Sequence, residues 1–205
     1  LKVHETLRDW GLHLLTSAFT ATATPEVQRQ LIKLLDLQNP VHETQPVARP
    51  NLHYRVIKTT KGQRDQELVD LIQGLRKTEE GRAGRIIVYA GSRDGTERVA
   101  SLLNEMGGMR AEAYHAGLSP AIRAELVELF QDRDIDVMVA TNAFGMGVDA
   151  PDIRLVVHYD APLSLEAYVQ EAGRAGRDGK AAYAVLLKSG NQRRRATNLI
   201  GKTYP

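Results

Sequence analysis

The stretch "RIIVYAGSRDGTERVASLLNEM", residues 85–106, decides the fold class. Its opening "RIIVYA" is an apolar run rich in β-branched residues, which is typical of a strand buried on both faces. A short polar loop follows, and the residues after it place apolar side chains at the spacing of one helical face. These side chains are Val99, Leu102, Leu103 and Met106. The stretch therefore predicts a strand, a loop and an amphipathic helix.

The same unit recurs along the chain. We predict strands at 51–57, 85–90, 111–117, 136–141, 153–159 and 181–188, and helices at 63–75, 95–106, 119–130 and 164–172. The helix at 119–130 opens with Ser119 and Pro120 and turns Ile122, Leu126, Leu129 and Phe130 to one side. Strands that alternate with crossover helices indicate an α/β fold, a doubly wound parallel sheet with helices on both faces.

The chain also shows a boundary. Residues 38–51 are polar and contain three prolines, which is typical of a linker. Before it we predict a buried strand that runs into a loop at 13–19, and a helix at 24–37 that turns Val27, Leu31, Leu34 and Leu35 to one face. After the regular alternation, residues 192–200 predict a last helix. We divide the chain into residues 1–40, a linker at 41–50, a main domain at 51–190 and a terminal segment at 191–205. Since it starts at Leu1 without methionine, we expect a piece of a longer protein.

Composition narrows the function classes. The 205 residues are 42% hydrophobic and 25% charged, which fits globular domains with a real core. A net charge of +2 means that nucleic-acid contacts must come from local patches. No cysteine is present, which excludes disulfides and cysteine-ligated metals within these residues, and we expect no metal site. No apolar run approaches the length of a membrane span, so we expect no membrane partner.

Polar residues follow several of the predicted strands. Ligands of doubly wound sheets bind beyond the carboxyl ends of strands, and hydroxyls, small residues and backbone amides there suit phosphate oxygens. The residues are Ser92, Arg93, His115, Gly117, Thr141 and Asn142. A further stretch, "QEAGRAGRDG" at 170–179, sets Arg174 and Arg177 among three glycines. Arginine supplies a rigid fork of donors, and glycine allows close approach, so this stretch predicts a phosphate site.

The ordered wording "FTATAT", "ARPNL", "YHAGL", "ATNAFGMGVDAPD" and "QEAGRAGRDG" resembles the RecQ family of superfamily-two DNA helicases, from about residue 14 to about residue 190. The resemblance implies two RecA-like lobes that clamp ATP between them. Residues 1–40 then look like the end of lobe one, and residues 51–190 look like lobe two. The phosphate loop "GxxxxGK[ST]" and a "DExH"-like box do not occur in the chain. The missing lobe is therefore expected to hold most of the ATP and Mg²⁺, and the fragment alone is not expected to hydrolyse ATP.

The resemblance also implies residue roles. Arg174 and Arg177 match the arginine pair that faces the terminal phosphate, and Gln170 would help to position phosphate or water. Gly147 and Asp149 match the motif that approaches the nucleotide from lobe two.

On the nucleic-acid side, the six loop residues named above match those that grip the backbone of single-stranded DNA. Thr22 and Thr24 match the lobe-one motif that couples nucleotide state to strand binding. The family implies 3′ to 5′ translocation, and a location in the cytoplasm or the nucleus according to the organism.

Structural alternatives stay open for single residues. Ser92 and Arg93 suit a helix cap, His115 a loop histidine with satisfied hydrogen bonds, and Asp149 a turn. Thr22 and Thr24 also suit capping, and "RRR" at 193–195 suits a solvated helix face. We expect Tyr114 and Tyr168 to be buried. At the level of function, the alternatives are an RNA helicase of the same superfamily and a non-catalytic lobe that only binds nucleic acid.

Overall fold

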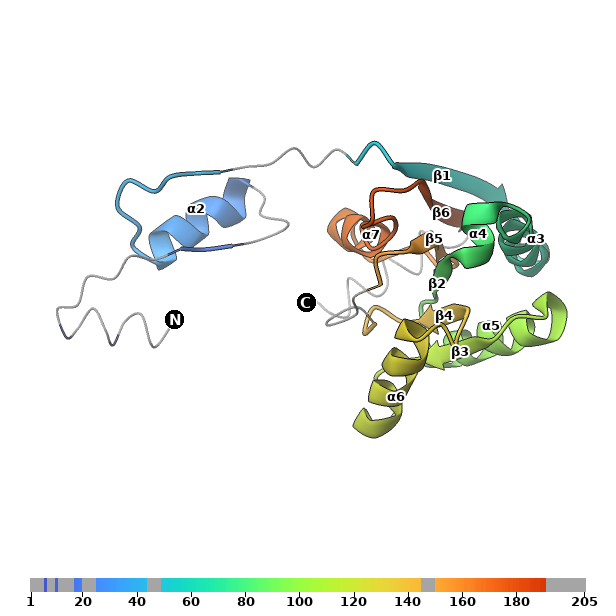
Figure 1. Cartoon of the computed structure of the whole chain (residues 1–205). Helices are drawn as coiled ribbons and strands as arrows, with labels where there is room; N and C mark the ends of the chain where they lie inside the picture. Colours follow the sequence, from blue (N-terminus) through green and yellow to red (C-terminus); the bar gives the residue numbers. More distant parts are fainter. Residues whose placement is uncertain are drawn as a thin grey trace. The chain divides into compact units, whose positions relative to one another are not determined.

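A computed structural model describes residues 25–43, 49–144 and 150–190, together with residues 6, 10 and 17–19. The chain divides into two compact units, Leu1–Ala48 and Arg49–Pro205. The described part of the first unit contains helix α2 (Pro25–Leu34), and the second unit contains the sheet (Figure 1).

The second unit is built on a sheet of six strands in which every neighbouring pair runs parallel. Across the sheet the order is β1-β6-β5-β2-β4-β3, which puts β1 and β3 at the two edges. Parallel neighbours cannot be joined by a tight turn, so each connection crosses a face of the sheet. The strands are β1 (Leu52–Thr59), β2 (Arg85–Tyr89), β3 (Ala111–Tyr114), β4 (Val137–Ala140), β5 (Ile153–His158) and β6 (Ala182–Ser189).

Helices cover both faces of this sheet. In Figure 1, α6 and α7 lie on one side, and α3 and α5 lie on the other. Ser119 and Ser164 cap the first pair: the Ser119 hydroxyl accepts from the Ile122 amide at 3.3 Å, and the Ser164 hydroxyl from the Ala167 amide at 3.1 Å. The helices of the second unit's described part are α3 (Arg64–Arg76), α4 (Glu79–Ala83), α5 (Arg93–Gly107), α6 (Pro120–Gln131) and α7 (Leu165–Ala172).

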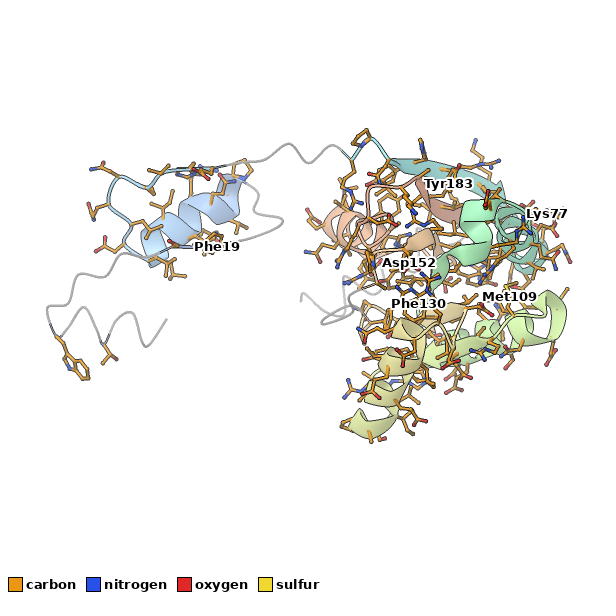
Figure 2. The ribbon with its side chains drawn as sticks, viewed as in Figure 1. Phe19, Lys77, Met109, Phe130, Asp152 and Tyr183 are labelled. Carbon is orange, nitrogen blue, oxygen red and sulfur yellow. The ribbon has the colours of Figure 1, made fainter. Side chains whose placement is uncertain are left out.

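The core consists of two hydrophobic clusters, one on each face. Strand β2 shows the division, because Ile87 and Tyr89 belong to one cluster, and Ile86 and Val88 belong to the other. The first cluster lies beneath α6 and α7 and includes Phe130, which sits where α6 meets the sheet (Figure 2). The second lies beneath α3 and α5. Strand β2 is buried throughout, as its apolar run predicted.

The predicted fold class is confirmed, and so are the helices and strands expected between residues 51 and 188. Helix α4 was not predicted, and its N-cap is Thr78, whose hydroxyl accepts from the Gly81 amide at 3.0 Å. The predicted strand at 13–16 and the predicted helix at 192–200 lie outside the described residues. Residues 17–19 form no strand.

Two residues that the predicted apolar helix faces turned toward the sheet, Met106 and Ile122, are exposed in the structure. Met106 is 50% exposed and Ile122 is 45% exposed. Both lie in a terminal turn of a helix that is longer than the strands it covers. Twelve helical residues span about 18 Å, whereas a strand of four residues spans about 13 Å, so the helix ends extend past the sheet.

Helix α2 confirms the helix predicted at 24–37, but its apolar face is not covered within the described part of the first unit. Val27 is 41% exposed and Leu34 is 53% exposed, and no residue of α2 is buried.

Replacement of Phe130 by alanine should lower the free energy of unfolding by about 3–5 kcal/mol, because it removes a fully buried ring. That ring packs edge-on against Phe144, with 5.8 Å between centroids. Urea unfolding of the 205-residue chain, followed by circular dichroism, measures the change. Ile122→Ala on the same helix is the control, and it should cost less than about 1 kcal/mol because Ile122 is exposed. Equal losses in the two variants would contradict this description of the core.

Candidate functional site

The carboxyl ends of β2, β3 and β4 bring the predicted loop residues together at one edge of the sheet. The Thr141 amide donates to the Tyr114 carbonyl at 3.1 Å, which joins the loops after β4 and β3. A Cβ atom on Gly117 would lie 3.1 Å from Arg93 Nη1, so the Arg93 side chain passes close to the loop after β3. Residues from three separate parts of the sequence therefore form one surface.

Ser92 is the N-cap of α5. Its hydroxyl accepts from the Gly95 amide at 3.1 Å, as the capping alternative proposed. Arg93 is the first residue of the helix, and it is exposed. Since the first turn of a helix presents backbone N–H groups and the positive end of the dipole, this loop offers an environment that suits an anion.

His115 is buried, and both of its ring nitrogens are used inside the protein. Nδ1 accepts from the Gly117 amide at 3.2 Å, and Nε2 lies 3.1 Å from a carboxylate oxygen of Glu97. Because Nδ1 is the acceptor, Nε2 carries the proton and donates to Glu97. His115 thus shapes the turn at 115–117, as expected for a loop histidine with satisfied hydrogen bonds, and the exposed Gly117 forms the surface of the turn.

The loop after β4 begins with Thr141, which is half-buried, and Asn142, which is exposed. The Thr141 hydroxyl accepts from the Ala143 amide at 3.4 Å and supports the start of the turn. Of these two side chains, the Asn142 amide is the more accessible to a ligand.

The loop after α7 carries the two arginines of the predicted phosphate site. Arg174 is half-buried and hydrogen-bonds the hydroxyl of Tyr89, the last residue of β2. Arg177 is exposed and acts on the same hydroxyl through its charge. Burial raises the pKa of Tyr89 well above its usual range, and the two arginines oppose this rise by favouring the ionised form. Both arginines are therefore close enough to the end of β2 to act on the Tyr89 hydroxyl electrostatically.

A buried pair, His158 and Glu171, joins β5 to α7. His158 Nε2 donates to a carboxylate oxygen of Glu171 at 2.8 Å. His158 Nδ1 has no hydrogen-bond partner among the described residues. The Tyr89 ring stacks on His158 with 5.4 Å between ring centroids, and the ring of the half-buried Tyr168 packs against His158 in a tilted arrangement at 4.8 Å. The histidine therefore fixes Tyr89 against the helix that precedes Arg174.

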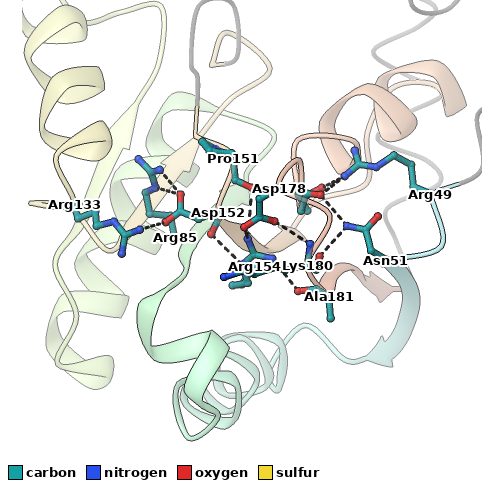
Figure 3. Close-up of polar contacts among 12 residues, drawn as sticks. Arg49, Asn51, Arg85, Arg133, Pro151, Asp152, Arg154, Asp178, Lys180 and Ala181 are labelled. Carbon is teal, nitrogen blue, oxygen red and sulfur yellow. Dashed lines mark hydrogen bonds and ion pairs between the residues drawn. The ribbon is translucent and has the colours of Figure 1, made fainter.

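Further along, the arginine loop is tied to the start of β5. The Gly176 amide donates to the Ile153 carbonyl at 2.8 Å, and Gly176 has a φ of +59°. A Cβ atom there would lie 2.7 Å from the Asn51 amide nitrogen, so only glycine fits. Buried Arg154 forms an ion pair with Asp178 and donates to the Ala181 carbonyl at 3.1 Å (Figure 3).

Gln170 is exposed and lies on α7, one helical turn before Arg174. The other predicted site residues, Thr22, Thr24, Gly147 and Asp149, lie outside the described residues.

The residues that support the arginine loop were not predicted from the sequence. They are Arg49, Asn51, Tyr89, His158 and Glu171. Arg49 and Asn51 lie inside the quoted stretch "ARPNL", Glu171 lies inside the quoted glycine-arginine stretch, and Tyr89 and His158 end apolar strands with a polar group. Nothing in the local sequence indicated which groups they contact.

The described residues show neither a metal site nor a membrane-spanning helix. In that part of the chain, no group of three or more histidine, cysteine or acidic side chains is placed to hold a metal ion. The described helices are also too short or too polar to cross a membrane.

Comparison with known proteins gives the family. Residues 63–179 match the family model of the helicase conserved C-terminal domain. Two relatives come from Bacillus subtilis: a probable ATP-dependent DNA helicase, RecS, is 38% identical over 84% of this chain, and an ATP-dependent DNA helicase, RecQ, is 41% identical over 84% of it. The matches cover 34% of RecS and 28% of RecQ.

Among solved structures, S. cerevisiae Dbp5 bound to RNA and ADP BeF3 matches with a TM-score of 0.69. The match covers 91% of this chain and 48% of Dbp5 at 20% identity. At this identity the likeness shows the fold alone, which is the RecA-like fold predicted from the sequence.

The Arg154–Asp178 pair predicts a pH-dependent stability. The hydrogen bond from Arg154 lowers the pKa of Asp178 below its ordinary value of 3.8, burial opposes this, and the Lys180 amide adds to it. A lowered folded-state pKa stabilises the protein above about pH 4, and the contribution is lost as pH falls through the folded-state pKa. Asp178→Asn should therefore cost about 1–2 kcal/mol at pH 7, with the difference from the parent closing below about pH 4.

Urea unfolding of the 205-residue chain between pH 7 and pH 2.5 measures this difference. Asp134→Asn, which breaks the exposed pair with Arg110, is the control and should change little. A difference for Asp178→Asn that is independent of pH would contradict the assignment.

Proposed function

The chain belongs to the family of helicase conserved C-terminal domains, in its RecQ-like branch, and from this premise we propose that it forms the second lobe of an ATP-dependent DNA helicase. In this proposal Arg174 and Arg177 contact the phosphates of ATP held by another lobe of the same protein. The residues at the ends of β2, β3 and β4 grip single-stranded DNA.

The observation that carries the proposal is the loop after α7, where the Arg49 and Asn51 side chains hold the backbone beside Arg174 and Arg177. Both arginines also lie close enough to the Tyr89 hydroxyl, at the end of β2, to favour its ionised form. Two guanidinium groups in one place suit phosphate oxygens, which accept bidentate hydrogen bonds.

ATP, when bound, supplies the free energy of phosphoryl transfer to water. Arg174 and Arg177 stabilise the negative charge that develops on the transferred group. Gln170, exposed one turn before Arg174, orients the phosphate or the attacking water. Gly147 and Asp149 approach the nucleotide from the same lobe, as the family motif implies.

The remaining parts of the ATP site belong to the first lobe in this proposal. The chain contains no "GxxxxGK[ST]" phosphate loop, and its described residues offer no acidic cluster for Mg²⁺. The first lobe therefore binds most of the ATP and the metal, and the 205-residue chain alone does not hydrolyse ATP.

The proposed DNA grip is independent of base sequence. Arg93 and Asn142 are exposed and contact the sugar-phosphate backbone with their side chains, and Gly117 lets it approach the turn. Ser92, His115 and Thr141 contribute by holding the three turns in shape. Thr22 and Thr24 couple this grip to the nucleotide, and opening and closing of the two lobes moves the strand in the 3′ to 5′ direction.

DNA is favoured over RNA as the substrate. The relatives named ATP-dependent DNA helicases are 38% and 41% identical to the chain, whereas the RNA-bound Dbp5 is 20% identical and supports only the fold.

Arg174→Ala in the intact helicase should lower kcat for DNA-stimulated ATP hydrolysis by about 10³–10⁵-fold, because the developing charge loses its partner. Affinity for single-stranded DNA should change less than about threefold, since Arg174 lies outside the DNA grip. A coupled ATPase assay and fluorescence anisotropy measure the two quantities. Arg110→Ala, at an exposed arginine paired with Asp134, is the control and should match the parent. Full ATP turnover in the Arg174 variant would refute the proposed role.

Arg93→Ala should weaken binding of single-stranded DNA and reduce the slope of log K against log salt by about 0.7, the contribution of one phosphate contact on a single strand. Anisotropy titrations at several KCl concentrations measure the slope. Oligonucleotides of different sequence should lose affinity equally, because a phosphate contact reads no base. A slope that equals that of the parent would remove Arg93 from the grip.

A further inference from the structure

A third arginine, Arg49, hydrogen-bonds the loop that carries Arg174 and Arg177. It lies 124 residues before its contact residue Gly173 in the sequence. Arg49 Nη1 donates to the Gly173 carbonyl at 3.0 Å, and Nη2 donates to the Ala175 carbonyl at 2.8 Å and to the Gly176 carbonyl. Figure 3 shows Arg49 reaching across to these carbonyl oxygens.

These carbonyls are groups that need a donor. The Gly173 carbonyl follows directly on α7, which ends at Ala172, and lacks an intrahelical partner. Ala175 and Gly176 lie in the loop beyond, where the Gly176 carbonyl also accepts from the Gly179 amide at 3.1 Å. The C-terminus of α7 carries the negative end of the helix dipole, which favours a nearby cation. Only an arginine offers two parallel pairs of donors on a fixed plane, so one side chain can satisfy three carbonyls.

Two of the carbonyl groups that Arg49 bonds lie directly before Arg174 and Arg177 in the chain. The Gly173 carbonyl belongs to the peptide bond that joins residue 173 to Arg174. The Gly176 carbonyl belongs to the peptide bond that joins residue 176 to Arg177. Arg49 therefore holds the backbone immediately before each of them, and a shift of its guanidinium would move both.

Asn51 makes the grip rigid. Its side-chain amide donates to the Gly176 carbonyl at 2.8 Å and to the Lys180 carbonyl at 2.8 Å. The backbone carbonyl of Asn51 accepts from the amide of Ala182, the first residue of β6, at 2.9 Å. Pro50 lies between Arg49 and Asn51 in the chain, and its ring fixes the backbone angle φ. The Leu52 amide donates to the Arg49 carbonyl at 3.0 Å and closes a turn. The segment Arg49-Pro50-Asn51 is thus short and rigid, and it holds the arginine loop by hydrogen bonds from two side chains.

We propose that Arg49 is a positioning residue that aims Arg174 and Arg177 at the nucleotide, which rests on the function proposed above. Arg49 is also the first residue of the second unit. The orientation of Arg174 and Arg177 therefore depends on the residue at which the chain enters that unit. Arg49 itself touches no nucleotide in this proposal, because all of its described contacts are backbone carbonyls.

The test compares Arg49→Ala and Arg49→Lys with the parent in the intact helicase. Misplacement of a reacting group by about 1 Å costs about 100-fold in rate, so Arg49→Ala should lower kcat for DNA-stimulated ATP hydrolysis by about 10- to 100-fold. KM for ATP and affinity for single-stranded DNA should change less than about threefold, because binding groups are kept. Arg49→Lys keeps the charge but not the fork, and its kcat should fall between those of the parent and the alanine variant.

Chemical rescue separates aiming from folding. Guanidinium chloride at about 10–50 mM, far below denaturing concentrations, should restore part of kcat to Arg49→Ala by reoccupying the vacated place on the carbonyls. It should not raise kcat of the parent or of Arg110→Ala, the exposed control. Circular dichroism reports folding of each variant.

Arg49→Ala with parental kcat would overturn the inference, and so would a folded variant whose lost kcat guanidinium does not restore. If Arg49→Ala does not fold, Arg49→Lys decides: a folded protein with reduced kcat and unchanged KM supports the inference, and parental kcat or an unfolded protein overturns it. Arg174→Ala keeps the two proposals apart. Its full turnover would refute the proposed function, whereas loss of turnover there together with parental kcat in Arg49→Ala would refute only the role of Arg49.

Discussion

The structure depends on the common direction of its six strands. Parallel neighbours force every connection across a face of the sheet, so the chain supplies helices to both sides and buries the central strands between two clusters. The same rule puts the carboxyl ends of all strands at one edge. Arg93, His115 and Thr141 are far apart in the sequence, yet they follow three strands and meet at that edge.

A second requirement comes from the glycine-rich loop. Its backbone turns where α7 ends and before β6 begins, so its carbonyls pair neither in the helix nor in the sheet. Side chains from elsewhere satisfy them: Arg49 and Asn51 come from the segment before β1, and Arg154 comes from β5. Arg49 and Arg154 thus face the protein and hold the loop, whereas Arg174 and Arg177 are the arginines proposed to bind phosphate.

The two halves of the proposed mechanism meet at the end of β2. Tyr89 contacts Arg174 and stacks on His158, while Ser92, three residues later, caps the helix that begins with Arg93. The Gly91 amide between them donates to a carboxylate oxygen of Asp160 at 3.0 Å, which ties this loop to the one after β5. The proposed nucleotide contact and the proposed strand contact are therefore separated by one short segment that Asp160 anchors.

By itself, the sequence determined the fold class, the order of strands and helices along the chain, and the loops that carry the candidate site residues. It did so because alternation of buried runs with amphipathic segments is a local pattern, and because the position of a loop after a parallel strand fixes its edge of the sheet. The pattern also suggested phosphate chemistry at Arg174 and Arg177 from residue type alone. Only the tertiary structure decided which groups hold that loop. Arg49 and Gly173 are 124 residues apart, and nothing in either segment encodes the other. Likewise, only the structure shows that His115 is buried, bonds Glu97 and shapes the turn at 115–117. Such hydrogen-bond partners are set by packing and not by the neighbours in the chain.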